Sequence, residues 1–331
     1  MAQHAAPAPR ESWTTRTFGR FMNDVRTNPG DALFRAILTA LAAGTLLLML
    51  WIVWELFANS RDVFQSFGTR FITGRNWDPV QGIFGALAFI FGTIVTSLVA
   101  IVIAGPVGLA AAIFIAEYAP VWMRGTLSFL AELLAAVPSI VFGLWGIFVF
   151  APWMARTGMP FLKDYFGWIP IFSGPSFGVS IITAGIILSI MVVPTVIAIS
   201  RDVLLAVPGS QREGMYALGA TKWETIRMSV LPFARAGVIG ATILALGRAV
   251  GETMAVTMVI GNRPAITHSL FRPGYTMASV IANEFNESRN PLHTDAMIAI
   301  GLVLFGVTLL INVFARLLVM KVARGRRLTG I

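Results

Sequence analysis

The stretch SQREGMYALGATKWETIRMSVLP, residues 210–232, is a polar and charged segment that joins two long apolar runs. Two capping boxes, SQRE at 210–213 and TKWE at 221–224, each predict the start of a helix. In a capping box the side chain of the first residue accepts a hydrogen bond from the N–H of the fourth, and the side chain of the fourth accepts one from the N–H of the first. Gly219 lies between the boxes, where a left-handed residue ends the first helix, and Pro232 marks the entry to the next apolar run. The segment is therefore predicted to be a helix–turn–helix.

The apolar side chains of this helix–turn–helix allow two interpretations. They pack on the protein's own helices, or they present a helix face to a groove on a partner. A third use, DNA binding, is disfavoured because the segment is tethered between two apolar runs. The side chains concerned are Met215, Leu218, Trp223, Ile226 and Val230.

The composition of the chain indicates a membrane protein. Of its 331 residues 56% are hydrophobic and only 12% are charged, with a mean hydropathy of +0.76, whereas soluble domains carry about 25% charged residues. The chain has no cysteine and three scattered histidines, so disulfides are excluded and no metal site is expected. The net charge of +9 does not indicate nucleic-acid binding, because the basic residues flank the apolar runs.

Apolar runs long enough for about 20 residues of membrane-spanning helix occur six times. They predict an all-α membrane protein with one permease domain over 32–320, whose core is about 83–320. A polar tail precedes this domain at 1–31, and a basic tail follows it at 321–331. The predicted spans are roughly 32–57, 83–116, 127–151, 178–200, 233–261 and 295–320.

The distribution of Lys and Arg predicts the orientation of these spans. One side collects 16 of the 25 basic residues, namely four in each tail, four in the loop 201–232, and Arg35, Arg124, Arg235 and Arg316. Basic flanks favour the cytoplasmic side. Both termini are therefore expected to be cytoplasmic, which agrees with an even number of spans. The loops 58–82, 152–177 and 262–294 are expected to face outward. The tail 1–31 does not have the pattern of a signal peptide.

A second stretch, LGRAVGETMAV at 246–256, places two charges inside an apolar run. Each charge at the centre of a membrane helix costs about 2.5–3.5 kcal/mol on insertion scales. Arg248 and Glu252 have i, i+4 spacing, so they are expected to share a helix face and to pair. Gly247 and Gly251 form a GxxxG step that lets another helix approach. The pair is either a structural brace or part of a pathway in which Arg248 attracts an anion.

Other charges near the apolar runs are expected to be structural. Glu132 is predicted to cap or pair near the cytoplasmic end of its helix. Glu117 and Arg124 are expected to be solvated at the cytoplasmic interface. Pro138 and Pro194 are expected to kink their helices for packing.

The segment 210–232 resembles the EAA loop of ABC-importer permeases, in which Glu-Ala-Ala is followed by Gly and ends in Leu-Pro. Gly214 and Met215 replace the two Ala. In that family the loop contains the coupling helix, which docks into an ATPase subunit, so residues 201–232 are here named the coupling loop. The positions that the resemblance assigns to this role are Glu213, Leu218, Gly219, Trp223, Leu231 and Pro232.

Three further stretches resemble the PstC family of phosphate-specific permeases: LGRAVGETMAV, ELLAAVPSIVFGLWGIFVFAP at 132–152 and FGALAFIFGTIVTS at 84–97. PstA-type permeases share the RAxGET core but continue differently. The resemblance implies a type I ABC importer (MetI-like) fold with a cytoplasmic coupling helix, in a bacterial cytoplasmic (inner) membrane. It also implies a heterodimer with a PstA-type permease, a PstB-type ATPase dimer inside and a PstS-type phosphate-binding protein outside.

The chain is not expected to be an enzyme. Gly214 and Gly219 imitate the start of a P-loop, but Ala220 and Thr221 follow where Lys and Ser/Thr are required. No cofactor is expected in this chain, since ATP and Mg would be bound by the partner ATPase. The alternatives are a permease for another oxyanion, a PstA-type subunit, a membrane-embedded enzyme and a passive channel. The last two are disfavoured because no catalytic constellation is evident and because a passive channel needs no coupling loop.

Overall fold

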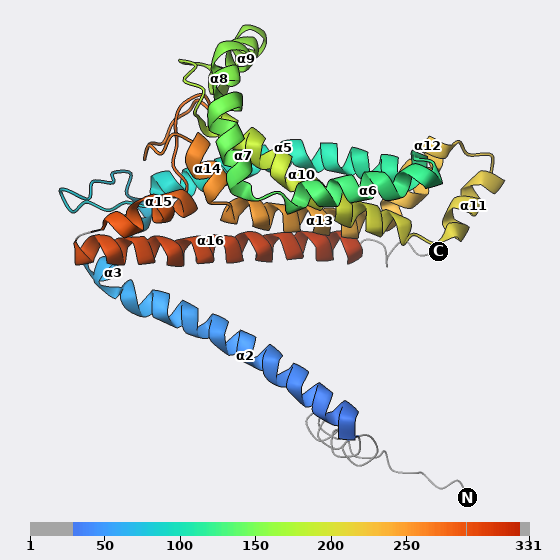
Figure 1. Cartoon of the computed structure of the whole chain (residues 1–331), viewed down its shortest axis with the longest axis horizontal. Helices are drawn as coiled ribbons and strands as arrows, with labels where there is room; N and C mark the ends of the chain where they lie inside the picture. The colour runs from blue at the N-terminus through green and yellow to red at the C-terminus, as the bar shows by residue number, and fades with distance from the viewer. Residues whose placement is uncertain (1–28, 289, 325–331) are drawn as a thin grey trace, which may run out of the picture. The chain divides into compact units, whose positions relative to one another are not determined.

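The computed structural model describes residues 29–288 and 290–324, and the regular structure of this part is almost entirely helical (Figure 1). Apart from a single bridge between Asp78 and Ile83, no strand pairing occurs in the described ranges. Six helical stretches are long and apolar enough to cross a membrane. The predicted all-α class with six membrane helices is therefore confirmed. Most of the two tails, 1–31 and 321–331, lies outside the described residues.

The contacts divide the chain into two units, and the first contains helix α2 (Pro29–Asn59). Its apolar part, Leu33–Asn59, confirms the first predicted span. Apolar side chains cover this helix on all sides, which is the pattern of a helix whose surroundings are lipid or other apolar helices.

Helix α10 (Ile181–Leu205) is the centre of the second unit, with 67% of its most apolar window buried. It packs most extensively against α5 (Leu87–Ile113) and then against α13 (Leu231–Gly251). The closest approach is made at glycines, since a Cβ on Gly185 would lie 2.5 Å from Val99. Small residues let membrane helices pack this tightly, so the core of α5, α10 and α13 depends on them.

The second predicted span, 83–116, is one continuous helix in which α5 runs through Pro106 into the π-helical turn η1 (Phe114–Tyr118). Pro106 therefore does not end the helix.

The third predicted span, 127–151, is wrong. Pro138 divides this run, because the residue before a proline is pushed out of the helical region, and Val137 is extended with ψ 127°. Helix α6 (Val121–Ala136) ends there, and a new helical stretch forms the apolar span Ser139–Phe166. The predicted outward loop 152–177 is therefore helical in its first half. The parts of this stretch are α7 (Ser139–Trp145), η2 (Gly146–Phe150), α8 (Ala151–Trp153), η3 (Met154–Gly158) and α9 (Met159–Phe166).

The fifth predicted span, 233–261, begins earlier and ends earlier in the structure. Helix α12 (Lys222–Thr225) continues through the π-helical turn η5 (Ile226–Val230) into α13, so Pro232 lies within a continuous helical stretch. Proline has no N–H to donate to the preceding turn, and the π turn occurs directly before it. After α13 the chain extends briefly and forms the separate helix α14 (Met254–Val259).

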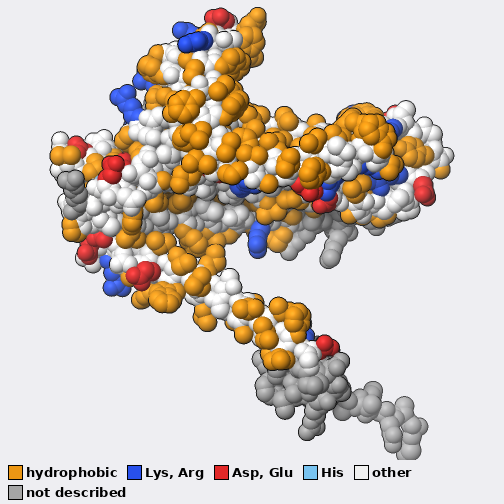
Figure 2. Space-filling model, viewed as in Figure 1, with side chains coloured by type: hydrophobic (Ala, Val, Ile, Leu, Met, Phe, Trp, Pro, Cys, Tyr) orange, Lys and Arg blue, Asp and Glu red, His pale blue; other side chains and the backbone are white. Residues whose placement is uncertain are grey.

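The last predicted span is confirmed by α16 (Pro291–Arg324), which lies along α13 (Figure 1). Near its start it also contacts two shorter helices, α3 (Arg61–Phe67) and α15 (Met277–Glu284). Figure 2 shows apolar side chains covering much of the surface of the second unit, as expected for helices that face lipid or other apolar helices. The remaining short elements are α4 (Arg70–Thr73), η4 (Pro170–Phe172), α11 (Gly209–Ala217) and η6 (Phe285–Glu287).

Candidate functional site

Arg248 lies in the last turn of α13 with its side chain exposed in this single chain. Its Nη1 donates one weak hydrogen bond, 3.4 Å long, to Thr195 Oγ1 on α10. Thr195 follows Pro194, which lies inside α10. The guanidinium makes no ion pair with any carboxylate that the structure describes, so most of its donors are available to an anion or to another chain.

Glu252 does not share a helix face with Arg248, and this prediction is wrong. Helix α13 ends at Gly251, and Glu252 is extended with ψ 127°. Its Oε1 instead accepts a hydrogen bond of 3.3 Å from the backbone N–H of Ala255, in the first turn of α14. A carboxylate at a helix N-terminus satisfies an otherwise unpaired N–H. Glu252 therefore has a local partner within its own backbone segment.

Among the described residues, nothing occupies the glycine step of α13. A Cβ at Gly247 or Gly251 would meet none of their heavy atoms within 4 Å, and the same is true of Gly240, about two turns before Gly247. Leu244, between them, is 61% exposed. By contrast, Gly237 on the same helix is packed against Val203 of α10. One face of α13 is thus used inside the chain, while the face bearing Arg248 stays open to a partner helix.

The turn of the helix–turn–helix has the predicted geometry. Gly219 has φ +81°, and its N–H bonds to the Tyr216 carbonyl while that of Ala220 bonds to Met215. This is the Schellman pattern that ends a helix in a left-handed residue. Next, Thr221 and Glu224 form the second predicted capping box.

The first predicted capping box is wrong. Helix α11 begins after Pro208, and neither Ser210 nor Glu213 makes the capping bonds. The side chain of Arg212 reaches back instead and donates to the Val207 carbonyl, at 2.7 Å. Proline at the cap fixes φ and begins the helix two residues early.

The apolar side chains of this segment divide between the two interpretations. Ile226 and Val230 are fully buried, and Val230 packs in a cluster with Leu204 of α10 and Ala234 of α13. Leu218 and Trp223 are 84% and 53% exposed, respectively. Exposed apolar groups that gather at one place indicate a binding surface. Leu218 and Trp223 are therefore a candidate binding surface, while Ile226 and Val230 are part of the buried core.

An ion pair that the sequence did not predict holds α11 in place. Arg212 Nη2 lies 2.7 Å from Glu117 Oε1, and its Nε lies 3.2 Å from the same oxygen. Nη2 also donates to the Leu204 carbonyl at 2.9 Å. Glu117 was expected to be solvated, but its side chain is only 8% exposed. A buried carboxylate needs such a partner. The sign of this ion pair in the sequence was a single acidic residue at the end of an apolar run.

Two other charges near the apolar runs, Arg124 and Glu132, also have partners. Arg124, expected to be solvated, donates to the Ala119 carbonyl at the end of η1, at 2.9 Å. Glu132 lies 3.8 Å from Arg201 on α10. The structural pairing predicted for Glu132 is confirmed, in a long and half-exposed form that contributes little to stability.

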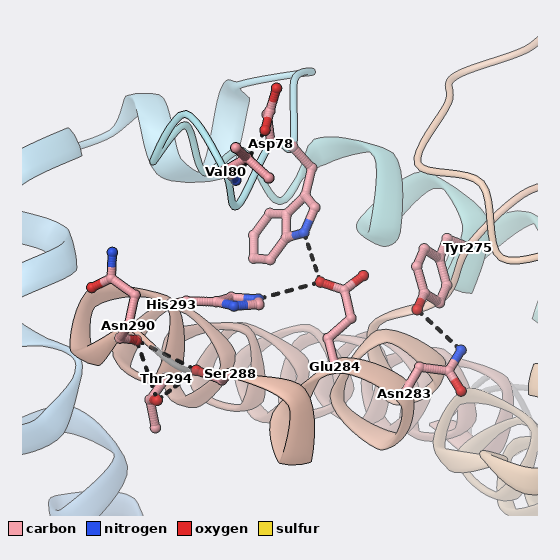
Figure 3. Close-up of polar contacts among 10 residues, drawn as sticks. Asp78, Val80, Tyr275, Asn283, Glu284, Ser288, Asn290, His293 and Thr294 are labelled. Carbon is pink, nitrogen blue, oxygen red and sulfur yellow. Dashed lines mark hydrogen bonds and ion pairs between the residues drawn. The ribbon is translucent and has the colours of Figure 1, made fainter.

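A polar cluster joins α15, the start of α16 and the segment before α5 (Figure 3). Glu284 Oε2 accepts from Trp77 Nε1 at 3.0 Å and lies 3.3 Å from His293 Nε2. The imidazole stacks on Phe84, with ring centroids 5.6 Å apart. Nearby, burial raises the pKa of Tyr275 to about 12. The described residues include no group of three His, Asp or Glu that could hold a metal ion.

Comparison with known proteins identifies the family. The family described as binding-protein-dependent transport system inner membrane component matches residues 104–324. A phosphate transport system permease protein PstC from Mesorhizobium japonicum is 43% identical over 324 residues, covering 97% of each chain. The chain belongs to the PstC family of binding-protein-dependent transport permeases.

More distant comparisons agree with this family. A PstC protein of Xylella fastidiosa is 42% identical over 96% of this chain and 97% of its own length. A probable PstC of Methanocaldococcus jannaschii is 37% identical over 78% of this chain and 83% of its own. The crystal structure of a bacterial ABC transporter for alginate import superposes with a TM-score of 0.57, covering 95% of this chain and 100% of that chain at 15% identity. This last likeness concerns the fold alone, and it agrees with the predicted ABC-importer permease fold.

Proposed function

We propose that this chain is the permease subunit of an ATP-driven phosphate importer and that it forms the pathway for inorganic phosphate with a second permease subunit. The observation that carries the proposal is the 43% identity to a PstC relative across 97% of both chains. The anchored loop with its exposed Leu218 and Trp223 supports energy coupling to another protein.

We assign each proposed partner a surface on this chain. A PstA-type permease would pack on the open glycine face of α13, and a PstB-type ATPase dimer, which binds ATP and Mg, would dock on α11 and α12. A PstS-type phosphate-binding protein would dock at the end of the fold opposite α11 and α12. The protein is a multi-pass membrane protein, and we place both termini on the cytoplasmic side.

Arg248 is the residue that we propose phosphate contacts as it moves along the pathway. A cation in an apolar span is costly unless it meets water, a carboxylate or an anion. The only hydrogen bond that the described residues offer Arg248 goes to the neutral Thr195. Its face of α13 would meet the second permease, and the two subunits would enclose the pathway between them. A guanidinium provides a fork of donors that matches phosphate oxygens.

The test is phosphate uptake into proteoliposomes that contain this chain with its proposed permease and ATPase partners. Uptake that needs ATP inside and the binding protein outside would support the importer. Uptake without ATP would indicate a passive channel. Equal competition by sulfate would indicate a permease for another oxyanion, and assembly only with a PstC-type partner would indicate a PstA-type subunit.

A further inference from the structure

A basin of about 330 Å³ lies between the segments 170–174 and 266–272. Its volume is about ten times that of a water molecule in the liquid, so it has room for a partly hydrated small anion. The polar side chains at its lining are Ser173, Thr267, His268, Ser269 and Arg272. We name it the Arg272 basin.

The Arg272 basin lies at the end of the fold opposite the coupling loop. The N–H of Ile181 bonds to the Arg272 carbonyl at 3.1 Å, and that of Ile182 bonds to Leu270 at 2.9 Å. These bonds attach the 270–272 segment to the first turn of α10. Helix α11 follows the last turn of α10, which is 25 residues long, or roughly 37 Å at 1.5 Å per residue.

The walls of the basin are bonded to each other. The N–H of Leu270 donates to the Ile171 carbonyl at 2.9 Å. Ser269 Oγ donates to the Ser173 carbonyl and accepts from the N–H of Phe271 at 3.2 Å. Because Ser269 is buried, this connection is shielded from water. The basin is therefore formed before any ligand arrives, which lowers the entropy cost of binding.

No acidic residue in the described part of the chain lines the basin. Arg272 and His268 are its only ionisable lining residues. The sequence has no Asp or Glu from residue 253 to 283, or from 165 to 201. Neither Arg272 nor His268 makes a side-chain hydrogen bond or an ion pair within the described ranges, and both side chains are exposed. A guanidinium with no acidic residue at the same lining attracts anions, and an imidazole N–H can donate a hydrogen bond to one.

The hydroxyl groups of the lining add a second feature. Ser173 Oγ donates to the Pro170 carbonyl at 2.6 Å, and Thr267 Oγ1 donates to the Ser269 carbonyl at 3.0 Å. Because each proton is engaged with the backbone, the oxygens offer lone pairs to a ligand. Inorganic phosphate keeps at least one proton near neutral pH, whereas sulfate keeps none. The lining therefore suits an oxyanion that also donates a hydrogen bond.

We propose that the Arg272 basin binds inorganic phosphate at the end of the fold opposite the coupling loop, before the anion enters the pathway. The choice of phosphate among oxyanions rests on the proposed function. The Arg272 guanidinium would hold the phosphate oxygens, with His268 as a second donor and the hydroxyl oxygens as acceptors for the phosphate proton. A carboxylate from a docked protein has related chemistry, and the experiment separates the two sources.

The experiment is calorimetric titration of the full chain in nanodiscs with inorganic phosphate. An Arg248→Gln background removes the contribution of the proposed pathway cation. We expect Arg272→Gln to weaken phosphate binding about tenfold or more, as for the loss of a charge-assisted hydrogen bond, and sulfate to bind more weakly than phosphate. The matched control is Arg263→Gln, because Arg263 is exposed in the same connection but does not line the basin. It should bind phosphate like the background.

Three outcomes would overturn the proposal: equal affinity in Arg272→Gln and its background, an equal loss in Arg263→Gln, or no phosphate binding at all. If phosphate does not bind but Arg272→Gln weakens association with the phosphate-binding protein, the basin holds a protein carboxylate. Failure of the importer function is seen separately, as a wild-type complex that imports no phosphate although the basin titrates normally.

Discussion

Arg212 on α11 bonds to Glu117 at the end of η1 and to the Leu204 and Val207 carbonyls at the end of α10. One guanidinium therefore joins the coupling loop to the ends of two membrane helices. Movement of α11 by a docked ATPase would be transmitted to α5 and α10 through these bonds, and α10 is the central helix of the unit. We therefore propose Arg212 as a positioning residue for coupling.

Arg212→Gln is expected to lower the thermal stability of the chain and to reduce ATPase binding. It leaves Glu117 buried without a cation, which costs about 3–5 kcal/mol in buried pairs. Glu117→Gln should cost less, because Arg212 keeps its two carbonyl acceptors. Thermal unfolding in detergent and ATPase co-purification measure both effects. Arg227→Gln, an exposed change in the same loop, is the control, and equal losses in it would contradict the anchoring role.

Gly219→Val is expected to disrupt the coupling loop through backbone strain alone. Its φ is +81°, and a Cβ there would meet no atom within 4 Å, so crowding plays no part. A left-handed residue other than glycine costs about 1–2 kcal/mol. Gly214→Val is the matched control, because Gly214 is equally uncrowded but has ordinary helical geometry. ATPase co-purification should fall for Gly219→Val only, and equal behaviour of the two variants would argue against this account.

Leu218→Ser and Trp223→Ala are expected to weaken ATPase binding without destabilising the chain. Burying one such side chain contributes about 1.5–3 kcal/mol, so each loss should raise the dissociation constant about tenfold or more. Ile226→Ala provides the contrast, since Ile226 is buried and a cavity there should cost about 2–5 kcal/mol of stability. If Leu218 and Trp223 behave like Ile226, they are part of the core and not of a docking surface.

Topology can be tested with single cysteines, because the chain has none. Val80 is 96% exposed in the segment before α5, and Leu218 is 84% exposed in the coupling loop. Because Leu218 is proposed to be covered by the ATPase, the cytoplasmic probe is Arg227, which is exposed in the same loop. We expect an impermeant maleimide to label Val80→Cys in intact cells and to label Arg227→Cys only after the membrane is opened. The reverse pattern would invert the proposed orientation.

Some local features of the site were predictable from the sequence, although the capping box at 210–213 was not, and distant contacts were not predictable. Gly219 and the capping box 221–224 depend on residues within one turn, so their pattern was sufficient. The break at Pro138 was missed because hydropathy stays high on both sides of it. The Arg212–Glu117 contact joins residues 95 apart in sequence, and no local pattern specifies such a partner.

The pair Arg248 and Glu252 shows the opposite failure, since their i, i+4 spacing led to a wrong predicted contact. The i, i+4 rule holds only while the helix continues, and α13 ends at Gly251. The rule therefore placed Arg248 beside Glu252 although Thr195 of α10 is its hydrogen-bond partner. This difference changes what substitutions at the two positions should do.

Arg248→Gln is expected to abolish phosphate uptake while the complex still assembles, because glutamine keeps hydrogen-bond donors but carries no charge. Glu252→Gln is expected to retain most uptake, since its amide oxygen can still accept from the Ala255 N–H. The measurement is uptake of radiolabelled phosphate, normalised to assembled complex.

The double variant Arg248→Gln/Glu252→Gln distinguishes a pathway residue from a structural brace. If the two charges paired only to offset each other in the assembled complex, Glu252→Gln would impair uptake and the double variant would recover it, because neither charge would then be left unpaired. If Arg248 serves the anion, the double variant should be as inactive as Arg248→Gln alone. The structure favours the second outcome, since Glu252 already has a backbone partner and Arg248 has no carboxylate partner among the described residues. Recovered uptake in the double variant would return the pair to a structural role.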